Sequence, residues 1–212
     1  MRDSIAAPRP LRSLLLASAA LLLLTTVPPA AAQSTGRAQA AGVAEIRAGA
    51  SSPKGDLGDL NDDGVLLGTA LGYRILPRVE LRAQLDFQNL ERGGRPSTLG
   101  GTVGPQTHLW HYLAGVQVEL TDPVISKWEI ALNALGGGTY YDISEGPPAV
   151  PDHSGHELTV HFSGQVGYDL FDSATLFARA GGYGMLGDAA EPPTYLGKEF
   201  VLTHAGGLRI RF

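Results

Sequence analysis

Apolar and polar residues alternate with a period of two in eight segments of this chain. The pattern is clearest in residues 78–89, where each odd position from Val79 to Phe87 is apolar and the even positions between them are polar. Because successive side chains of an extended strand point to opposite faces, each segment predicts a β-strand with one apolar and one polar face. The predicted strands are residues 43–50, 64–75, 78–89, 108–121, 127–140, 158–170, 174–186 and 200–212.

The connections between these strands alternate in length. Long connections cover residues 51–63, 90–107, 141–157 and 187–198, and short ones lie at residues 76–77, 122–123 and 171–173. Transmembrane β-barrels show this asymmetry, with long loops outside the cell and short turns in the periplasm. The pattern therefore predicts an all-β fold, an eight-stranded antiparallel up-and-down transmembrane β-barrel with both ends on the periplasmic side.

The N-terminus has the features of a cleavable signal peptide. Arg2, Arg9 and Arg12 form a basic region before an apolar run over residues 13–27. Ala30-Ala31-Ala32 then offers a cleavage site. The run is shorter than the roughly 20 residues of a spanning helix, and Pro28-Pro29 ends it, so a retained anchor is disfavoured. The predicted divisions are a signal peptide at 1–32, a short flexible lead at 33–42 and the barrel at 43–212.

Period-two alternation alone fits both a soluble barrel with an apolar interior and a membrane barrel with an apolar exterior. Aromatic residues favour the membrane barrel, because most of them are expected to lie near the two rims as interfacial belts. The periplasmic belt is predicted to hold Tyr73, Trp128, Tyr168, Phe177 and Phe212. The outer belt is predicted to hold Phe87, Trp110, Tyr112, Tyr140, Tyr141, Tyr183 and Phe200.

Charged residues of both signs share the polar faces of the predicted strands. On a lipid-facing wall, an arginine at mid-membrane costs about 2–4 kcal/mol, so we expect these side chains to pair inside the barrel. Eight strands leave an interior that side chains can fill, which predicts a plugged lumen. The predicted lumen charge network is Glu45, Arg47, Arg74, Glu80, Arg82, Asp86, Glu119, Glu129, Asp169, Arg179, Arg209 and Arg211.

Composition narrows the function classes. The 212 residues include no cysteine, so disulfides are excluded, and a formal net charge of −5 gives no indication of nucleic-acid binding. The sequence predicts no cofactor, a monomer, and outer-membrane lipids as partners. It does not identify an extracellular partner.

The last segment carries a family resemblance. Leu208, Ile210 and the terminal Phe212 share one face, and Arg209 and Arg211 share the other. With the eight segments and the loop asymmetry, this ending resembles the small outer-membrane β-barrel family, the OmpA-barrel and OmpX-like group. The resemblance implies an outer-membrane location in a Gram-negative-type bacterium, an assembly signal at these three apolar residues, and insertion by the barrel-assembly machinery. It also implies roles in envelope integrity, adhesion or small-solute passage.

Two motifs suggest chemistry. Asp59, Asn61 and Asp63 fit the opening of a calcium loop, but Ala70 stands where the loop's bidentate glutamate is expected. An Asp/Asn-rich turn is the favoured interpretation, and no metal site is predicted. His161 and Ser163 resemble the His-x-Ser spacing of lipid A deacylase barrels, but their parity directs both into the lumen, away from lipid.

His204 interrupts the apolar face of the last strand, and a bulge near Gly206-Gly207 is the expected explanation. The sequence as a whole predicts a non-enzymatic outer-membrane barrel with a structural or surface-interaction role carried by its extracellular loops. The alternatives are a narrow porin-like pore for ions or small solutes and a lipid A-modifying barrel enzyme.

Overall fold

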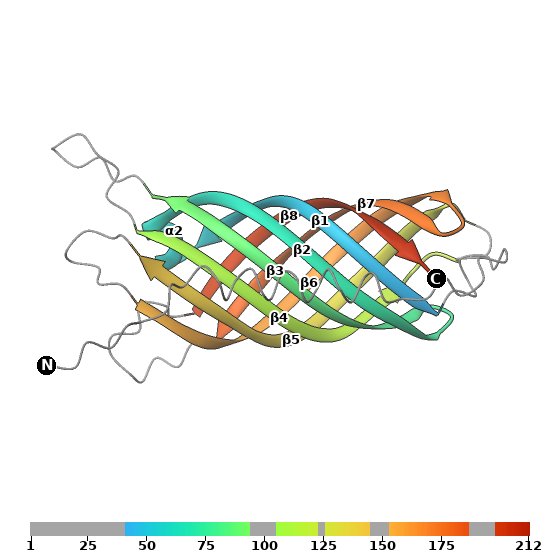
Figure 1. Ribbon diagram of the computed structural model, residues 1–212, viewed down its shortest axis with the longest axis horizontal. Helices are drawn as coiled ribbons and strands as arrows, with labels where there is room; N and C mark the ends of the chain where they lie inside the picture. The colour runs from blue at the N-terminus through green and yellow to red at the C-terminus, as the bar shows by residue number, and fades with distance from the viewer. Residues whose placement is uncertain (1–40, 94–104, 123–125, 145–152, 187–197) are drawn as a thin grey trace, which may run out of the picture. The chain divides into compact units, whose positions relative to one another are not determined.

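The computed structural model describes residues 41–93, 105–122, 126–144, 153–186 and 198–212. They form one closed barrel in which each strand pairs antiparallel with its chain neighbours (Figure 1). The strands are β1 (Gly42–Lys54), β2 (Asn61–Leu76), β3 (Val79–Arg92), β4 (Gln106–Glu119), β5 (Trp128–Ser144), β6 (His153–Phe171), β7 (Ala174–Leu186) and β8 (Lys198–Arg211). None of the helices in these ranges is long and apolar enough to cross a membrane.

The first and last strands close the barrel. β1 pairs along its length with both β2 and β8. At the end of β8, Gly42 N donates to Phe212 O at 2.8 Å, and Phe212 N donates to Gly42 O at 3.0 Å. We call this end, which also holds the short β2–β3 and β6–β7 connections, the turn end, and the opposite end the loop end (Figure 1).

The structure confirms the eight predicted strands but lengthens several of them at the loop end. β6 begins at His153 rather than at residue 158, because His153 still pairs with Ile143 of β5. Backbone pairing continues there although the alternation of polarity fades. The predicted loop at 51–63 is also wrong in detail, because it contains the end of β1, the start of β2 and a short helix, α2 (Asp56–Leu60).

The outer wall is apolar. Phe162, Tyr73 and Leu158 are 64%, 60% and 61% exposed, whereas charged residues of the inner face such as Glu45 and Arg209 are buried. Aromatic residues on the outer wall form two rings, a turn-end ring of Tyr73, Trp128, Tyr168 and Phe212 and a loop-end ring of Phe87, Trp110, Tyr112, Tyr140 and Phe200. The prediction is wrong for Phe177, Tyr141 and Tyr183, which lie on the inner face and are buried.

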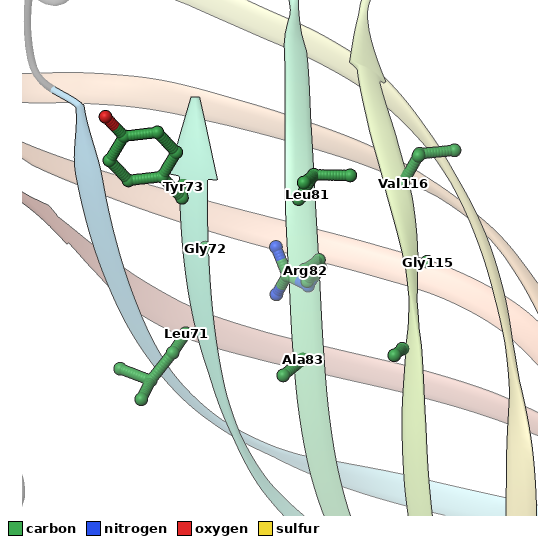
Figure 2. A pocket seen from close by; sticks show the side chains of 9 residues that line it. Leu71, Gly72, Tyr73, Leu81, Arg82, Ala83, Gly115 and Val116 are labelled. Carbon is green, nitrogen blue, oxygen red and sulfur yellow. The ribbon is translucent and has the colours of Figure 1, made fainter. Parts of the chain in front are cut away.

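A shallow groove crosses the outer wall of β2, β3 and β4. In Figure 2, Leu71, Tyr73, Leu81 and Val116 line it, and Gly72, Ala83 and Gly115 lie among them. Small residues between large apolar ones give the wall this relief. The groove belongs to the apolar exterior and carries no reactive group, since Arg82 of the same wall is buried and pairs with Glu45.

Candidate functional site

The predicted charge network lies on the inner face of the barrel, where six arginines and six carboxylates meet. Ten of the twelve residues are buried, and the side chains of Arg74 and Asp169 are 8% and 13% exposed. Each of the eight strands contributes at least one member of the network. The ion pairs therefore connect the whole circumference of the wall.

Glu45 is the centre of this network. Its carboxylate lies 2.5 Å from Arg82, 2.9 Å from Arg47, 3.0 Å from Arg179 and 3.3 Å from Arg209. These arginines come from β3, β1, β7 and β8. One carboxylate therefore connects strands on both sides of the barrel closure.

Glu129 organises the turn end of the lumen. It accepts hydrogen bonds from Arg209 at 2.5 Å and Arg211 at 2.6 Å, and Gln165 donates to it at 2.8 Å. Arg211 also reaches Asp169 at 3.2 Å. The charged face of the last strand is therefore neutralised by carboxylates of β5 and β6.

Asp86 organises the middle of the lumen. It pairs with Arg47, and it accepts hydrogen bonds from Gln84 at 2.6 Å and from the Tyr183 hydroxyl at 2.5 Å. The Tyr183 ring stacks on His111 and lies tilted against His161, with ring centroids 4.2 and 4.3 Å apart. Asp86, Tyr183 and the two histidines thus form a polar and aromatic layer on the loop-end side of the arginines that surround Glu45.

The network is balanced in charge. Removing one partner of a buried ion pair costs about 3–5 kcal/mol, although the intact pair contributes little net stability after desolvation. Inner glycines provide the space for these side chains, because a Cβ on Gly68 would lie 1.9 Å from Asp86 Oδ1 and 2.8 Å from Arg47 Nε. The arrangement can hold strands in register and fill the bore.

Buried apolar side chains form a cap at the loop end of the lumen, which the alternation of polarity does not predict. Its buried members are Leu57, Leu90, Leu109, Tyr141, Ile143, Met185 and Val201. Leu57 reaches into it from α2, and its backbone N–H donates to Glu199 Oε2 at 3.1 Å. Gly55, which precedes the helix, has φ of 74°, a conformation that favours glycine. The cap residues of the strands occupy the same inward-facing positions as the charged residues. Their parity in the sequence is therefore the signal that could have predicted them.

Glu157 lies beside Tyr141 of the cap, at the level of the loop-end ring, because its strand partner Thr139 precedes Tyr140 of that ring. Burial, and then the neighbouring Glu199 carboxylate, raise the pKa of Glu157 from 4.5 to about 7. Glu157 Oε2 has no hydrogen-bond partner among the described residues. The mouth therefore holds a carboxyl group that is partly protonated near neutral pH.

The structure separates the three residues of the calcium candidate. Asn61 is buried, and its amide donates to Leu57 O at 3.3 Å. Asp59 and Asp63 are exposed. Among the described residues no group of three or more His, Cys, Asp or Glu side chains could hold a metal ion. Asn61 instead caps the C-terminal end of α2.

The His161–Ser163 pair faces the lumen, as its parity predicts, and both residues are buried. His161 Nδ1 and Ser163 Oγ have no hydrogen-bond partner in the described part of the chain. The imidazole stacks on Tyr183 rather than orienting toward the hydroxyl. The pair therefore lacks the base-to-nucleophile hydrogen bond that an acyl-transfer site uses.

The expected bulge at Gly206-Gly207 is absent from the described strands. β8 keeps one continuous register with β1 and with β7 through these glycines. His204 consequently remains on the outer wall and is exposed there. Leu208, Ile210 and Phe212 lie on the same wall, and their role as an assembly signal stays a prediction.

Comparisons with known proteins agree with this architecture. The chain is similar in structure to Neisserial surface protein A, NspA (TM-score 0.63, 13% identity, 81% of this chain and 97% of the other). It is also similar to Ail, the attachment invasion locus protein of Yersinia pestis (0.55, 13%, 82% and 99%), and to a major outer membrane protein from Thermus thermophilus (0.53, 14%, 81% and 100%). The sequence matches no family model and no curated protein. These comparisons establish the fold of small eight-stranded outer-membrane β-barrels.

Proposed function

We propose that this chain is an integral outer-membrane β-barrel of a Gram-negative-type bacterium with a structural or surface-interaction role. The observation that carries the proposal is the inverted polarity of the barrel. Charged side chains such as Arg82 and Glu45 pair inside, while Leu71, Phe162 and other apolar residues face outward between two aromatic rings. The hydrocarbon chains of lipid would cover the apolar outer wall, and the barrel-assembly machinery would insert the chain into the membrane.

Purification tests the location directly. The mature chain should require detergent or lipid to stay monodisperse, and it should migrate differently on a gel with and without heating. A chain that stays monodisperse in plain buffer, with Leu71 and Leu81 accessible to aqueous labels after cysteine substitution, would contradict the proposal.

The buried side chains of the inner face support a plugged, non-conducting barrel as part of this proposal. The ion-pair network occupies the turn end and middle, and the apolar cap occupies the loop end. In planar bilayers the protein should give no large, steady conductance. Stable open levels in the wild-type chain would instead favour the pore.

A narrow pore is the second candidate, and one observation favours it. Gln88 has no hydrogen-bond partner for either side-chain polar atom among the described residues, and His111 Nε2 has none. Buried polar groups of this kind usually bind internal water. A hydrated layer below the cap would become a conducting path only if the cap opened.

The loop-end extensions of β5 and β6 support a surface-interaction role. Both strands continue past the loop-end ring, to Ser144 and from His153. Replacing residues 94–104 with a Gly-Ser linker, which spares Leu90 of the cap, should reduce adhesion of cells that display the chain. The heat-modified band provides the control for equal display. The same replacement of residues 145–152 tests the second loop. If neither replacement changes adhesion at equal display, the surface-interaction role is rejected and the structural role is retained.

A further inference from the structure

His204 places a polar group on the apolar outer wall, four residues from Phe200 and eight from Phe212. It lies on β8 between Phe200 and Phe212, which belong to the two aromatic rings. Its backbone pairs with Ala50 of β1 and Ala180 of β7. If the wall faces hydrocarbon, as we propose above, this imidazole lies away from both water layers.

The polar atoms of His204 have no partner in the described part of the chain. The other polar, non-aromatic side chain of this band, Thr69, donates its hydroxyl to Glu45 O at 3.0 Å. Lysine and arginine reach an interface along long stems, but the imidazole lies one bond from Cβ. An unpaired polar group in hydrocarbon costs several kcal/mol, and ionisable residues inside a membrane usually mark functional contacts.

The strand neighbours of His204 on the outer wall are small residues. Ala50 and Ala180 flank it, and the next row toward the turn end is Ala178, Gly206 and Ala48. A Cβ on Gly206 would meet only Phe177 O at 3.7 Å, so the space outside this glycine is open. Larger side chains begin on the neighbouring strand β2, where the exposed Val65 and Leu67 pair with Ala50 and Ala48. Small residues allow close approach of another membrane protein's backbone.

We propose that the face formed by β7, β8 and β1 is the contact surface of a homodimer, in which the His204 imidazoles of two copies hydrogen-bond to each other. The proposal rests on the membrane location. It replaces the monomer that the sequence predicts.

Symmetry favours a second copy as the partner. Both copies enter the membrane in one orientation, so the two-fold axis of a dimer runs along the membrane normal and each residue meets its counterpart at the same depth. A neutral imidazole carries one donor and one acceptor on different ring nitrogens, so one imidazole can donate a single N–H···N hydrogen bond to the other. A lipid chain would fill this face, but it would leave the imidazole unpaired.

Cross-linking in lipid vesicles tests the proposal, because the native chain contains no cysteine. Ala50→Cys adds a thiol next to His204, and Ala114→Cys adds one to the outer wall of β4 as a matched control. A short thiol-reactive linker should give dimers of the Ala50→Cys chain and not of the Ala114→Cys chain. Equal yields from the two positions would indicate random collision and overturn the proposal.

Second substitutions in the Ala50→Cys chain test the imidazole and the small residues beside it. His204→Leu should lower the dimer yield about tenfold, as expected for loss of a membrane hydrogen bond of about 1–2 kcal/mol. His204→Asn should retain dimers, because an amide also donates and accepts. Gly206→Val should abolish dimers, whereas Gly136→Val should not, since a Cβ on Gly136 meets nothing within 4 Å and lies on another face of the barrel.

The outcomes separate the two proposals. Failure of every chain to insert, shown by a heat-insensitive band, would reject the membrane location itself. Chains that insert and do not cross-link at position 50 would reject the dimer alone. Full cross-linking of the His204→Leu chain would reject the imidazole pair.

Discussion

Glu45 on β1 and Arg82 on β3 lie 2.5 Å apart inside the barrel, although β2 separates their strands. The pair spans the strand between them because both side chains point inward from a narrow closed wall. Three further arginines contact the same carboxylate. The stability of the barrel should therefore depend strongly on this one residue.

Glu45→Gln should lower the free energy of unfolding by about 3–5 kcal/mol, because it leaves several buried guanidinium groups without their counter-charge. Urea unfolding in lipid vesicles measures the change. The matched control is Asp122→Asn, which weakens the exposed Arg78–Asp122 pair of 3.2 Å and should cost less than about 1 kcal/mol. Equal effects of the two substitutions would show that the lumen is as well solvated as the surface.

Leu57→Ala should destabilise the barrel by about 2–5 kcal/mol, the usual range for a buried leucine. Leu57 is fully buried in the apolar cap, and its backbone N–H fixes α2 to Glu199 of β8. Brief conducting events in planar bilayers should accompany the loss, because the cap closes the loop end of the lumen. Asp59→Ala changes an exposed residue of the same helix and should alter neither measurement.

The strands and the inner charged set follow from the sequence, whereas the pairing within the lumen does not. Parity alone directs Arg82 and Glu45 inward, because a strand has only two faces. Which carboxylate meets which guanidinium depends on how far the strands are staggered around the barrel, and Arg82 reaches β1 rather than its neighbour β2. No local pattern specifies that stagger.

The cap and the belts show a second limit. Leu109 and Met185 are apolar, like the residues of the outer wall, but they occupy inward-facing positions of their strands. The structure places both in the cap. The position of Tyr183 along its strand matches the outer belt. Its odd parity, which it shares with Arg179, places the side chain inside the barrel instead. α2 is too short for helical periodicity to predict it.

Gly68→Ala should lower the free energy of unfolding by about 1–3 kcal/mol, the usual cost of overpacking. The added methyl group would occupy the place of Asp86 Oδ1 and crowd Arg47. Urea unfolding in vesicles is again the measurement. Gly136→Ala is the control, because its methyl group points into open space, and it should be neutral or slightly stabilising. A neutral Gly68→Ala would mean that the Asp86–Arg47 pair can move aside.

Ser163→Ala should leave the acylation pattern of lipid A unchanged. Ser163 faces the lumen, and its hydroxyl makes no hydrogen bond to His161. Mass spectrometry of lipid A from cells with and without the chain measures the pattern, and His161→Phe, which keeps a ring against Tyr183, is the companion variant. A species that loses an acyl chain only when Ser163 and His161 are both present would reinstate the enzyme.

The stability of the loop end should fall as pH rises from about 5 to about 8. Burial and Glu199 raise the pKa of Glu157 from 4.5 to about 7, so the folded chain binds a proton in this window that the unfolded chain has released. Stability therefore decreases with rising pH until Glu157 is ionised in both states. Glu157→Gln removes the titrating group and should flatten this part of the profile, whereas Glu91→Gln, at an exposed position, should reproduce the wild-type slope. Thermal unfolding at several pH values in this window measures the slopes, and parallel profiles for wild type and Glu157→Gln would contradict the assignment.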